Sequence, residues 1–342
     1  MNPIGQHNLL HVPSNAPSRR DLFRGLAAGA ATAGLLGSVT LPASAKARLS
    51  AGPQPAFYRR KIGDIEVTGL LDGYLAFDQA TLLALCAKAT PGAVARLNEK
   101  AFVPDSGKIA LPINAYVVNA GDKLILIDTG CADKFGPTAG GVPAALTAAG
   151  IDPASIDIVA LTHAHPDHAG GLITADGAAR FANAELVITG DDAKFWADPA
   201  TRTRLPDAQK GMVDIAAAAL KPYAARTRLI TNAADIAPGV TSYALPGHTP
   251  GHTGYRISSG ANQLLIFGDA TALSEWLFDQ PDWSLAFDVD PEATIATRRK
   301  MLDMAASDRL LLAGAHMPFP GFGHIASEGS AYRFAPAPWV AI

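Results

Sequence analysis

Cysteine is nearly absent from this chain: the 342 residues include only Cys86 and Cys131. Two cysteines are too few for the disulfide framework of small secreted domains, and their spacing matches no cysteine-based zinc motif. They could form one disulfide after export, but free cysteine is among the residue types most often buried in a protein core. We therefore expect two buried thiols that take no part in the chemistry.

Charged residues are also few, at 17% of the chain, and there is no long run of lysine or arginine. The formal net charge is −3, and it becomes −5 without the first 45 residues, where three arginines stand against a single aspartate, Asp21. Nucleic-acid binding depends on clustered basic side chains. The composition therefore argues against a nucleic-acid partner and favours a small-molecule substrate, and it is compatible with a homodimer.

The first 45 residues follow the pattern of an export signal. The pair Arg19-Arg20 precedes an uncharged stretch from 25 to 45, which ends in small residues, Ala43-Ser44-Ala45. The paired arginines resemble the twin-arginine type, which implies a bacterial protein that is exported already folded. The alternative, a membrane anchor, has less support because alanine, glycine, threonine and serine dominate the stretch. We expect no stable membrane anchor, a periplasmic or secreted location, and a mature chain that begins at Lys46.

Hydrophobic periodicity over the rest of the chain predicts strands in two groups, each followed by helices. The turn residues 119–122, Asn-Ala-Gly-Asp, also predict a hairpin. Such a pattern is typical of an α/β protein in which two sheets pack face to face with helices outside. The predicted strands are 62–77, 113–118, 123–127, 157–162, 185–189, 227–231, 241–245, 253–258, 263–267 and 309–313. The predicted helices are 91–100, 143–149, 169 onward, 206–221 and a helix that begins near Pro291.

The segment with the clearest chemical meaning is 162–168, Thr-His-Ala-His-Pro-Asp-His, directly after the apolar run 158–161. Three imidazoles and a carboxylate so close together cannot all face one side of a strand or helix, and Pro166 would interrupt either. They fit a loop at the end of a buried strand, where side chains can converge. A single histidine is usually an ordinary packed residue, but this grouping favours zinc, whose ligands are imidazole and carboxylate. The candidate ligands are His163, His165, Asp167 and His168.

Together with later segments, this motif resembles the metallo-β-lactamase superfamily. The matching segments, in the order of that family, are 127–130, 162–168, 247–252, 267–269 and 314–316. The resemblance implies an αβ/βα sandwich as a single hydrolase domain over residues 46–342, and a site for two Zn²⁺, although other divalent metals suit such ligands. It assigns His163, His165 and His248 to one metal, and Asp167, His168 and His316 to the other.

The same resemblance assigns roles around these ligands. Asp269 would bridge the two metals, and Asp167 and Asp269 would be the catalytic carboxylates. Asp128 and His252 would support the ligands by hydrogen bonding, as metal-bound histidine usually requires. We expect hydrolysis by a hydroxide that bridges the metals, without a protein nucleophile.

The substrate is suggested by a narrower resemblance. Segments 135–138 and 316–325 resemble the methyl parathion hydrolase group, which implies a neutral aryl ester or a phosphotriester. Aromatic side chains that follow the ligands would line an apolar mouth over such a site. The candidates for this lining are Trp196, Trp276, Phe319 and Phe322.

Two alternatives stay open. An N-acyl homoserine lactone lactonase would use the same seven ligands, but members of that group often carry tyrosine three residues after the bridging aspartate, where this chain has Ala272. An alternative from another class is a metal-dependent binding protein without catalytic activity. The complete set of ligands argues against the second alternative.

Overall fold

The computed structural model describes residues 54–103 and 107–340. The predicted export signal over residues 1–45 and the predicted mature start at Lys46 lie outside the described residues. Among the helices of the described segments, none combines the length and the apolar character needed to cross a membrane.

The first half of the described chain forms a seven-stranded mixed sheet. Its last four strands in spatial order, β5 to β8, run parallel, so their carboxyl ends lie on the same side of the sheet. The predicted turn at 119–122 does form a hairpin, in which Asn119 pairs with Leu124. In spatial order the strands are β1 (Phe57–Ile62), β2 (Ile65–Asp78), β4 (Lys108–Asn119), β5 (Leu124–Ile127), β6 (Ile158–Ala160), β7 (Glu185–Thr189) and β8 (Thr227–Ile230).

The second half forms another seven-stranded sheet, in which only β12 and β14 pair in parallel. A separate two-stranded pair joins β3 (Cys86–Ala87) to β13 (Ser284–Leu285). In spatial order the strands of the second sheet are β16 (Ala331–Pro336), β15 (Phe322–Glu328), β14 (Leu311–Ala313), β12 (Asn262–Ile266), β11 (Thr253–Ser259), β10 (Val240–Ala244) and β9 (Asp235–Ala237).

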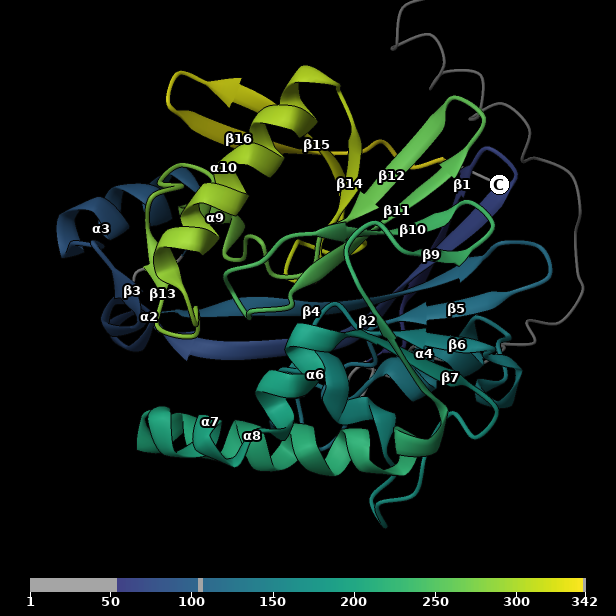
Figure 1. Cartoon of the computed structure of the whole chain (residues 1–342). Helices are drawn as coiled ribbons and strands as arrows, with labels where there is room; N and C mark the ends of the chain where they lie inside the picture. The colour runs from purple at the N-terminus through teal and green to yellow at the C-terminus, as the bar shows by residue number, and fades with distance from the viewer. Residues whose placement is uncertain (1–53, 104–106, 341–342) are drawn as a thin grey trace, which may run out of the picture. The chain divides into compact units, whose positions relative to one another are not determined.

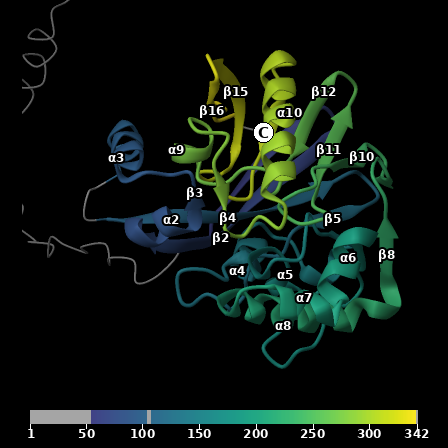
Figure 2. The same ribbon diagram turned by 60° about the vertical axis from the view of Figure 1, so that its left-hand side comes forward.

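The two sheets pack face to face, and helices cover their outer faces (Figure 1). Side chains such as Val67, Ile125 and Ile257 fill the space between the sheets. Helices α4 and α8 cover the first sheet and α10 covers the second, and the turned view gives the same arrangement (Figure 2). The helices are α2 (Gln79–Leu85), α3 (Pro91–Lys100), α4 (Val142–Ala148), α5 (Pro166–Ala169), α6 (Gly190–Ala197), α7 (Pro199–Arg204), α8 (Asp207–Leu220), α9 (Ser274–Leu277) and α10 (Pro291–Ser307), with 3-10 turns at Pro153–Ser155, Gly170–Leu172 and Lys221–Arg226.

The predicted sandwich of two sheets with helices outside is confirmed, and the helix at 91–100 has the predicted bounds. The prediction of a helix from 169 onward is wrong, because α5 ends at Ala169 and one 3-10 turn follows. Gly170 and Gly171 explain the stop: their backbones pack so closely on Cys131 and Thr129 that an added Cβ would lie within 2.8 Å and 2.0 Å of carbonyl oxygens. Both cysteines are buried free thiols, as expected.

A buried carboxylate anchors the loop that follows β5. Asp72 lies at an irregularity of β2, where the pairing with β4 shifts. Its oxygens accept backbone N–H hydrogen bonds from Cys131 at 3.1 Å, Gly140 at 3.0 Å and Val142 at 3.0 Å. One side chain therefore fixes both ends of the loop 131–141, whose residue Phe135 borders the cavity described below.

We predict that Asp72→Ala destabilises the fold by at least about 3 kcal/mol, because several buried N–H groups lose their only acceptor. Urea unfolding followed by circular dichroism measures the change, and Asp122→Ala, at an exposed turn, is the matched control. Equal midpoints for the two variants would contradict the anchoring role.

Candidate metal centre

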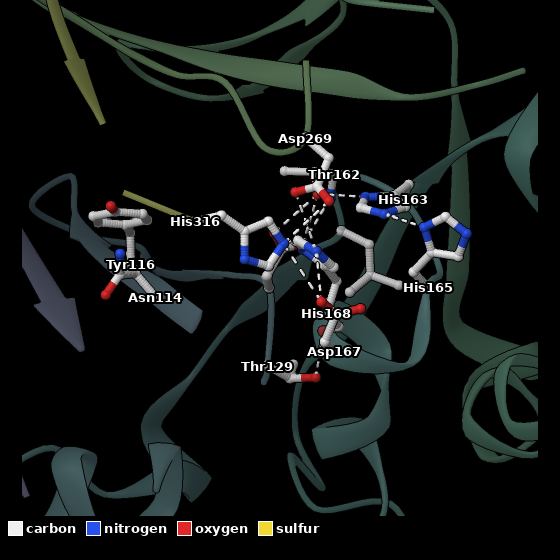
Figure 3. Close-up of polar contacts among 12 residues, drawn as sticks. Asn114, Tyr116, Thr129, Thr162, His163, His165, Asp167, His168, Asp269 and His316 are labelled. Atoms are coloured by element: carbon white, nitrogen blue, oxygen red, sulfur yellow. Dashed lines mark hydrogen bonds and ion pairs between the residues drawn. The ribbon is translucent and has the colours of Figure 1, made fainter. Parts of the chain in front are cut away.

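The seven predicted ligands lie together where strands of both sheets end. Figure 3 labels six of them, all except His248. His163 and His165 lie in the loop that follows β6, and Asp167 and His168 lie in the short helix α5 that comes next. The other three follow β10, β12 and β14 of the second sheet, at His248, Asp269 and His316. The site thus depends on the packing of the two sheets, since neither sheet supplies all of it.

Three imidazoles converge on one point. The Nε2 atoms of His163 and His248 each lie 2.9 Å from Nδ1 of His165. On the far side of its ring, His163 faces the Thr162 hydroxyl at 3.0 Å, and His248 faces the Asp288 carboxylate at 2.8 Å. A proton on Nδ1 of each ring would satisfy these partners and leave Nε2 as an acceptor aimed at His165. Two such acceptors facing a third ring form a contact that a cation can satisfy.

The second group pairs imidazoles with carboxylates. Nε2 of His316 lies 3.4 Å from Oδ2 of Asp167 and 3.1 Å from Oδ2 of Asp269. The same Asp269 oxygen is 3.4 Å from Nε2 of His248, in the first group. Asp269 thus faces ring nitrogens of both groups, as a bridging ligand must.

The electrostatics of the two groups differ. Burial lowers the pKa of His163 and His165 well below the ordinary range, so both rings are neutral. Burial acts the same way on His168, but nearby carboxylates, Asp269 foremost, outweigh it and raise the pKa of His168 well above its usual value. Burial also disfavours the charged form of Asp269, yet His316 and His168 hold its pKa well below the usual range. One half of the site offers lone pairs and the other half offers negative charge.

These residues fit a pair of divalent cations. Buried polar atoms in proteins almost always have a hydrogen-bond partner. Within the described residues, however, Nε2 of His168 and Oδ1 of Asp269 face each other at 3.2 Å without forming a hydrogen bond. Three ligand groups have donor atoms within 4.8 Å of one another: His163, His165 and His248; His163, His168 and Asp269; Asp167, His168 and His316. Imidazole and carboxylate donors at this spacing suit zinc and related ions.

Comparison with known families agrees with this geometry. Residues 109–316, more than half of the chain, match the family model of the metallo-beta-lactamase superfamily. The chain belongs to that superfamily. It is therefore a metallo-β-lactamase superfamily hydrolase with a His/Asp cluster able to bind metal.

Solved structures give the same result. The chain is 32% identical to AbOPH, a hydrolase of the beta lactamase superfamily, with a TM-score of 0.78 over 86% of this chain and 100% of that one. It is 26% identical to AidC, a dizinc quorum-quenching lactonase solved with a product, with a TM-score of 0.79 over 84% and 99%. A probable metal-dependent hydrolase from Staphylococcus aureus, 22% identical with a TM-score of 0.65 over 82% and 100%, shares the fold. No curated protein matches this chain.

In this superfamily member, Asp128 lies where the sequence places it. Its carboxylate accepts hydrogen bonds from the backbone N–H of Thr162 at 2.8 Å and from the Thr162 hydroxyl, and Nδ1 of His168 lies 2.9 Å away. These contacts fix the first turn of the 162–168 loop and direct Nε2 of His168 into the site. Asp128 has φ +59°, a left-handed conformation that aspartate tolerates better than most residues.

His252 hydrogen-bonds with the candidate ligand Asp269 rather than with its sequence neighbour His248. Its Nε2 accepts the backbone N–H of Asp269 at 2.9 Å. Nδ1 lies 2.8 Å from the Leu245 carbonyl, and burial lowers the pKa of His252 to about 3, so the ring is neutral. His252 therefore holds the backbone of Asp269.

Sequence reasoning missed Asp288, a buried residue whose Oδ1 orients His248. Its Oδ2 accepts the backbone N–H of Leu285 at 2.8 Å, which fixes the carboxylate. Nothing in the spacing of the sequence singles Asp288 out, since it follows β13 in an irregular segment. Only the fold brings it to the ring.

The sequence analysis also missed Arg298 of α10, whose guanidinium is buried. It donates hydrogen bonds to three backbone carbonyls, those of Ala270 at 3.0 Å, Pro281 at 3.0 Å and Trp283. Burial lowers the pKa of Arg298, because the charge has left water. One side chain thus ties Ala270, the residue after Asp269, to the segment that leads to Asp288.

The loop of His316 is held from the opposite sheet. Asn114 on β4 donates to the carbonyls of Gly314 and Met317 at 3.1 and 2.8 Å, and the Tyr116 hydroxyl donates to Gly314. Nδ1 of His316 lies 2.7 Å from the carbonyl of Pro112 on the same strand. Strand β4 therefore sets the position and the ring orientation of a ligand that comes from the other half of the chain.

The metal centre opens into a cavity of about 470 Å³. Besides five of the candidate ligands, the described residues that line it include one charged side chain, Lys108, and one other polar side chain, Thr138. The remaining twelve are apolar: Leu75, Ala76, Phe77, Leu82, Leu85, Leu111, Phe135, Met212, Ala272, Leu273, Leu285 and Phe287.

The predicted aromatic lining is largely not found there. Trp276 packs among the residues of α2, α3 and α9 and donates to Asn98, and Phe322 lies between the sheets with Phe319 half-buried beside it. Large aromatic side chains are effective core fillers, and sequence position alone does not separate the two roles. Trp196 is buried, with its ring centre 5.1 Å from that of His165, and it borders a smaller cavity next to the first.

We predict that Asp288→Asn weakens metal binding about 10- to 100-fold, because it removes the negative charge that orients and polarises His248. Competition against a coloured chelator measures this affinity. Asp282→Asn, on the same segment but in an exposed pair with Arg299, is the matched control. Metal binding by Asp288→Asn as tight as that of the control would refute this role.

Proposed function

We propose that this chain is a dinuclear-metal hydrolase, with zinc as its metal, that cleaves uncharged aryl esters or phosphotriesters. The observation that carries this proposal is the junction of the seven-residue cluster with an apolar cavity. An anionic substituent held against the apolar wall, away from the cluster, would lose its hydration with Lys108 as its one cationic neighbour among the described lining residues. A neutral ester with apolar substituents gains free energy from burial against the same wall.

The residues of the chain have distinct parts in this proposal. His163, His165 and His248 would hold one cation, and Asp167, His168 and His316 the other, with Asp269 shared between them. When bound, the cations supply an activated water and an electrophile for the substrate oxygen. The carboxylate of Asp167 borders the cavity and can hold the proton that water releases, while the apolar walls keep bulk water from the reacting bond.

A lactonase acting on N-acyl homoserine lactones is the second candidate, and the likeness to AidC favours it. One feature of the cavity speaks against it: Ala272 lines the wall where related lactonases often place tyrosine. None of the described residues around this cavity is a tyrosine, so no phenol is available to hold the lactone. We therefore rank the aryl ester or phosphotriester first.

The deciding experiment compares kcat/KM for a p-nitrophenyl ester, a dialkyl aryl phosphotriester and an N-acyl homoserine lactone. Each is measured on the protein as isolated, after chelator treatment and after zinc is returned. We expect the first two substrates to exceed the lactone, with activity lost to chelator and restored by zinc. Lactone turnover far above the others would make the lactonase assignment correct, and no chelator-sensitive turnover would favour a binding protein.

The ligand assignment gives a second test. We predict that His316→Ala lowers the metal content from two ions to one per chain. It should also reduce kcat/KM by more than about 100-fold, a larger loss than that caused by removing a residue that only hydrogen-bonds to a ligand. Metal analysis and kinetics measure the two effects. The control is His324→Ala, a half-exposed histidine whose Nδ1 contacts backbone carbonyls. Two ions per chain in His316→Ala would contradict the assignment.

A further inference from the structure

A separate cavity of about 530 Å³ lies at the end of the second sheet that is opposite to the metal centre. The parallel strands β12 and β14 begin at this cavity, where Asn262 and Leu311 line it, and their other ends lead to Asp269 and His316. Strand β1 of the first sheet forms another wall, and it lies against β11 and β12 (Figure 1). The described residues that line this cavity are all different from those that line the cavity of the metal centre, so the hydrolase chemistry gives it no role.

The side chains that line this cavity carry an excess of positive charge. Arg60 and Lys61 come from β1, Arg256 from β11, and Arg309 from the turn between α10 and β14. Among the described lining residues Asp308 is the one carboxylate, so four positive charges stand against one negative charge. The chain beyond residue 45 has a formal net charge of −5, so this space, which we call the basic cavity, is opposite in sign to the protein as a whole.

The four cations of the basic cavity are not used in ion pairs. Within the described segments, no carboxylate lies at ion-pair distance from any of them, and the side chains of Lys61 and Arg309 form no hydrogen bond there. Arg60 donates only to the Pro338 carbonyl, at 3.2 Å. The charge of the basic cavity is therefore available to an external anion. By contrast, six other arginines of the same segments pair with carboxylates: Arg59, Arg202, Arg204, Arg228, Arg299 and Arg333.

Arg256 has a hydrogen-bond donor that lacks a partner. Its guanidinium carbon lies 5.0 Å from the centre of the Tyr243 ring, and its Nη2 lies 3.6 Å from the sulfur of Met304. These contacts hold the guanidinium in place, but its Nε is buried and has no hydrogen-bond partner among the described residues. Buried N–H groups in proteins almost always have a partner. A bound anion would supply an acceptor and would also pair with the cation.

Helix α10 ends beside the basic cavity, and the carboxyl end of a helix disfavours anions. Its last carbonyls are already satisfied, because those of residues 304–306 accept backbone N–H groups from residues 308–310. The Asp308 side chain is exposed and forms no ion pair within the described part of the chain. The opposition to an anion is therefore largely that of one exposed carboxylate.

We propose that the basic cavity binds a phosphate monoester of a small polar alcohol, such as a sugar phosphate. A phosphate monoester has three terminal oxygens and up to two negative charges, so cations on separate strands can contact it from different sides, and arginine can pair with two of its oxygens at once. The cavity is much larger than a phosphate group, and the side-chain amides of Asn262 and Gln263 in its wall can pair with hydroxyl groups. This binding is independent of the proposed hydrolysis.

Isothermal titration calorimetry of the protein as isolated, with hexose 6-phosphate as the ligand, tests this site. We expect one ester per chain, an affinity that falls as NaCl screens the charges, and no binding of the hexose without its phosphate. Arg256→Gln should weaken the binding more than about 10-fold, the scale of a hydrogen bond to a charged group. Binding of the hexose as tight as that of its phosphate ester would overturn the proposal.

An exposed substitution tests the same site without disturbing the core. Arg309→Ala should weaken the binding about threefold, within the range of an exposed ion pair. Arg96→Ala is the matched control, because Arg96 is an exposed arginine on α3 that lies outside the basic cavity. Equal affinities of Arg309→Ala and Arg96→Ala for the ester would contradict the proposal.

The carboxylate of Asp308 gives a test of opposite sign. Asp308→Asn should tighten the binding of hexose 6-phosphate about threefold, because it removes the one negative charge in the wall. Asp122→Asn, at an exposed turn elsewhere in the fold, is the matched control and should leave the affinity unchanged. Unchanged or weaker binding in Asp308→Asn would place the anion elsewhere.

Metal ions also attract anions, so a further comparison separates the basic cavity from the metal centre. His316→Ala, which we expect to lose one metal ion, should bind hexose 6-phosphate as tightly as the unmodified protein. Loss of binding in His316→Ala with full binding in Arg309→Ala would place the ester at the cluster and overturn the proposal. The titration requires no turnover, so the binding can persist even where the proposed ester hydrolysis fails.

A lipid headgroup is a second source of a phosphate group, and vesicles that contain phosphatidate distinguish it from a soluble ester. We expect no sedimentation of the protein with these vesicles. Sedimentation that depends on Arg309, without binding of hexose 6-phosphate, would overturn the assignment to a small soluble ester.

Discussion

The metal site depends on hydrogen bonds to the outer ring nitrogens of the candidate ligand histidines, which turn their inner nitrogens toward the centre of the site. Thr162, Asp288 and the Pro112 carbonyl each face the far nitrogen of a ligand ring, and Asp128 does the same for His168. His163 is neutral, so its near nitrogen is left bare and buried, whereas neighbouring carboxylates raise the pKa of His168 and that ring carries positive charge beside Asp269. Such a group of acceptors in a low-dielectric interior is unfavourable unless positive charge occupies its centre. The hydrogen bonds outside the cluster therefore determine that it binds cations.

The same contacts explain why the ligands meet although they are far apart in the chain. The loop of His163 and His165 is held on one side by Asp128 and on the other by Asp192, whose carboxylate accepts the backbone N–H of Ala164 at 2.9 Å. Burial raises the pKa of Asp192 to about 6, and the hydrogen bonds that its carboxylate accepts offset part of the desolvation free energy. Arg298 and Asn114 hold the segments from the second sheet. The position of each ligand is set by an element from elsewhere in the fold.

The loop 162–168 stood out in the sequence because it follows an apolar strand and groups imidazoles with a carboxylate. His248, Asp269, His316 and Asp128 were assigned only by the family resemblance, and the fold brings them to the same loop. Asp288 and Arg298 were not, because a single aspartate or arginine in an irregular segment or on a helix has no spacing that marks it. The prediction of a helix beyond 169 failed because backbone packing at Gly170 overrode local propensity. Trp276 and Phe322 were misplaced because hydrophobicity alone does not distinguish a core side chain from a cavity wall.

Reaction type and substrate choice thus depend on different parts of the chain. The cluster is built at strand ends, where small changes would displace a ligand, so its motifs can be identified in the sequence. The cavity walls come from α2, α8 and the segment 285–289, where the fold requires only that a side chain be apolar. A leucine, methionine or phenylalanine at these positions would each leave a different space beside His165. Two hydrolases with the same seven ligands can therefore differ in substrate through positions such as 212 and 287, which no metal motif contains.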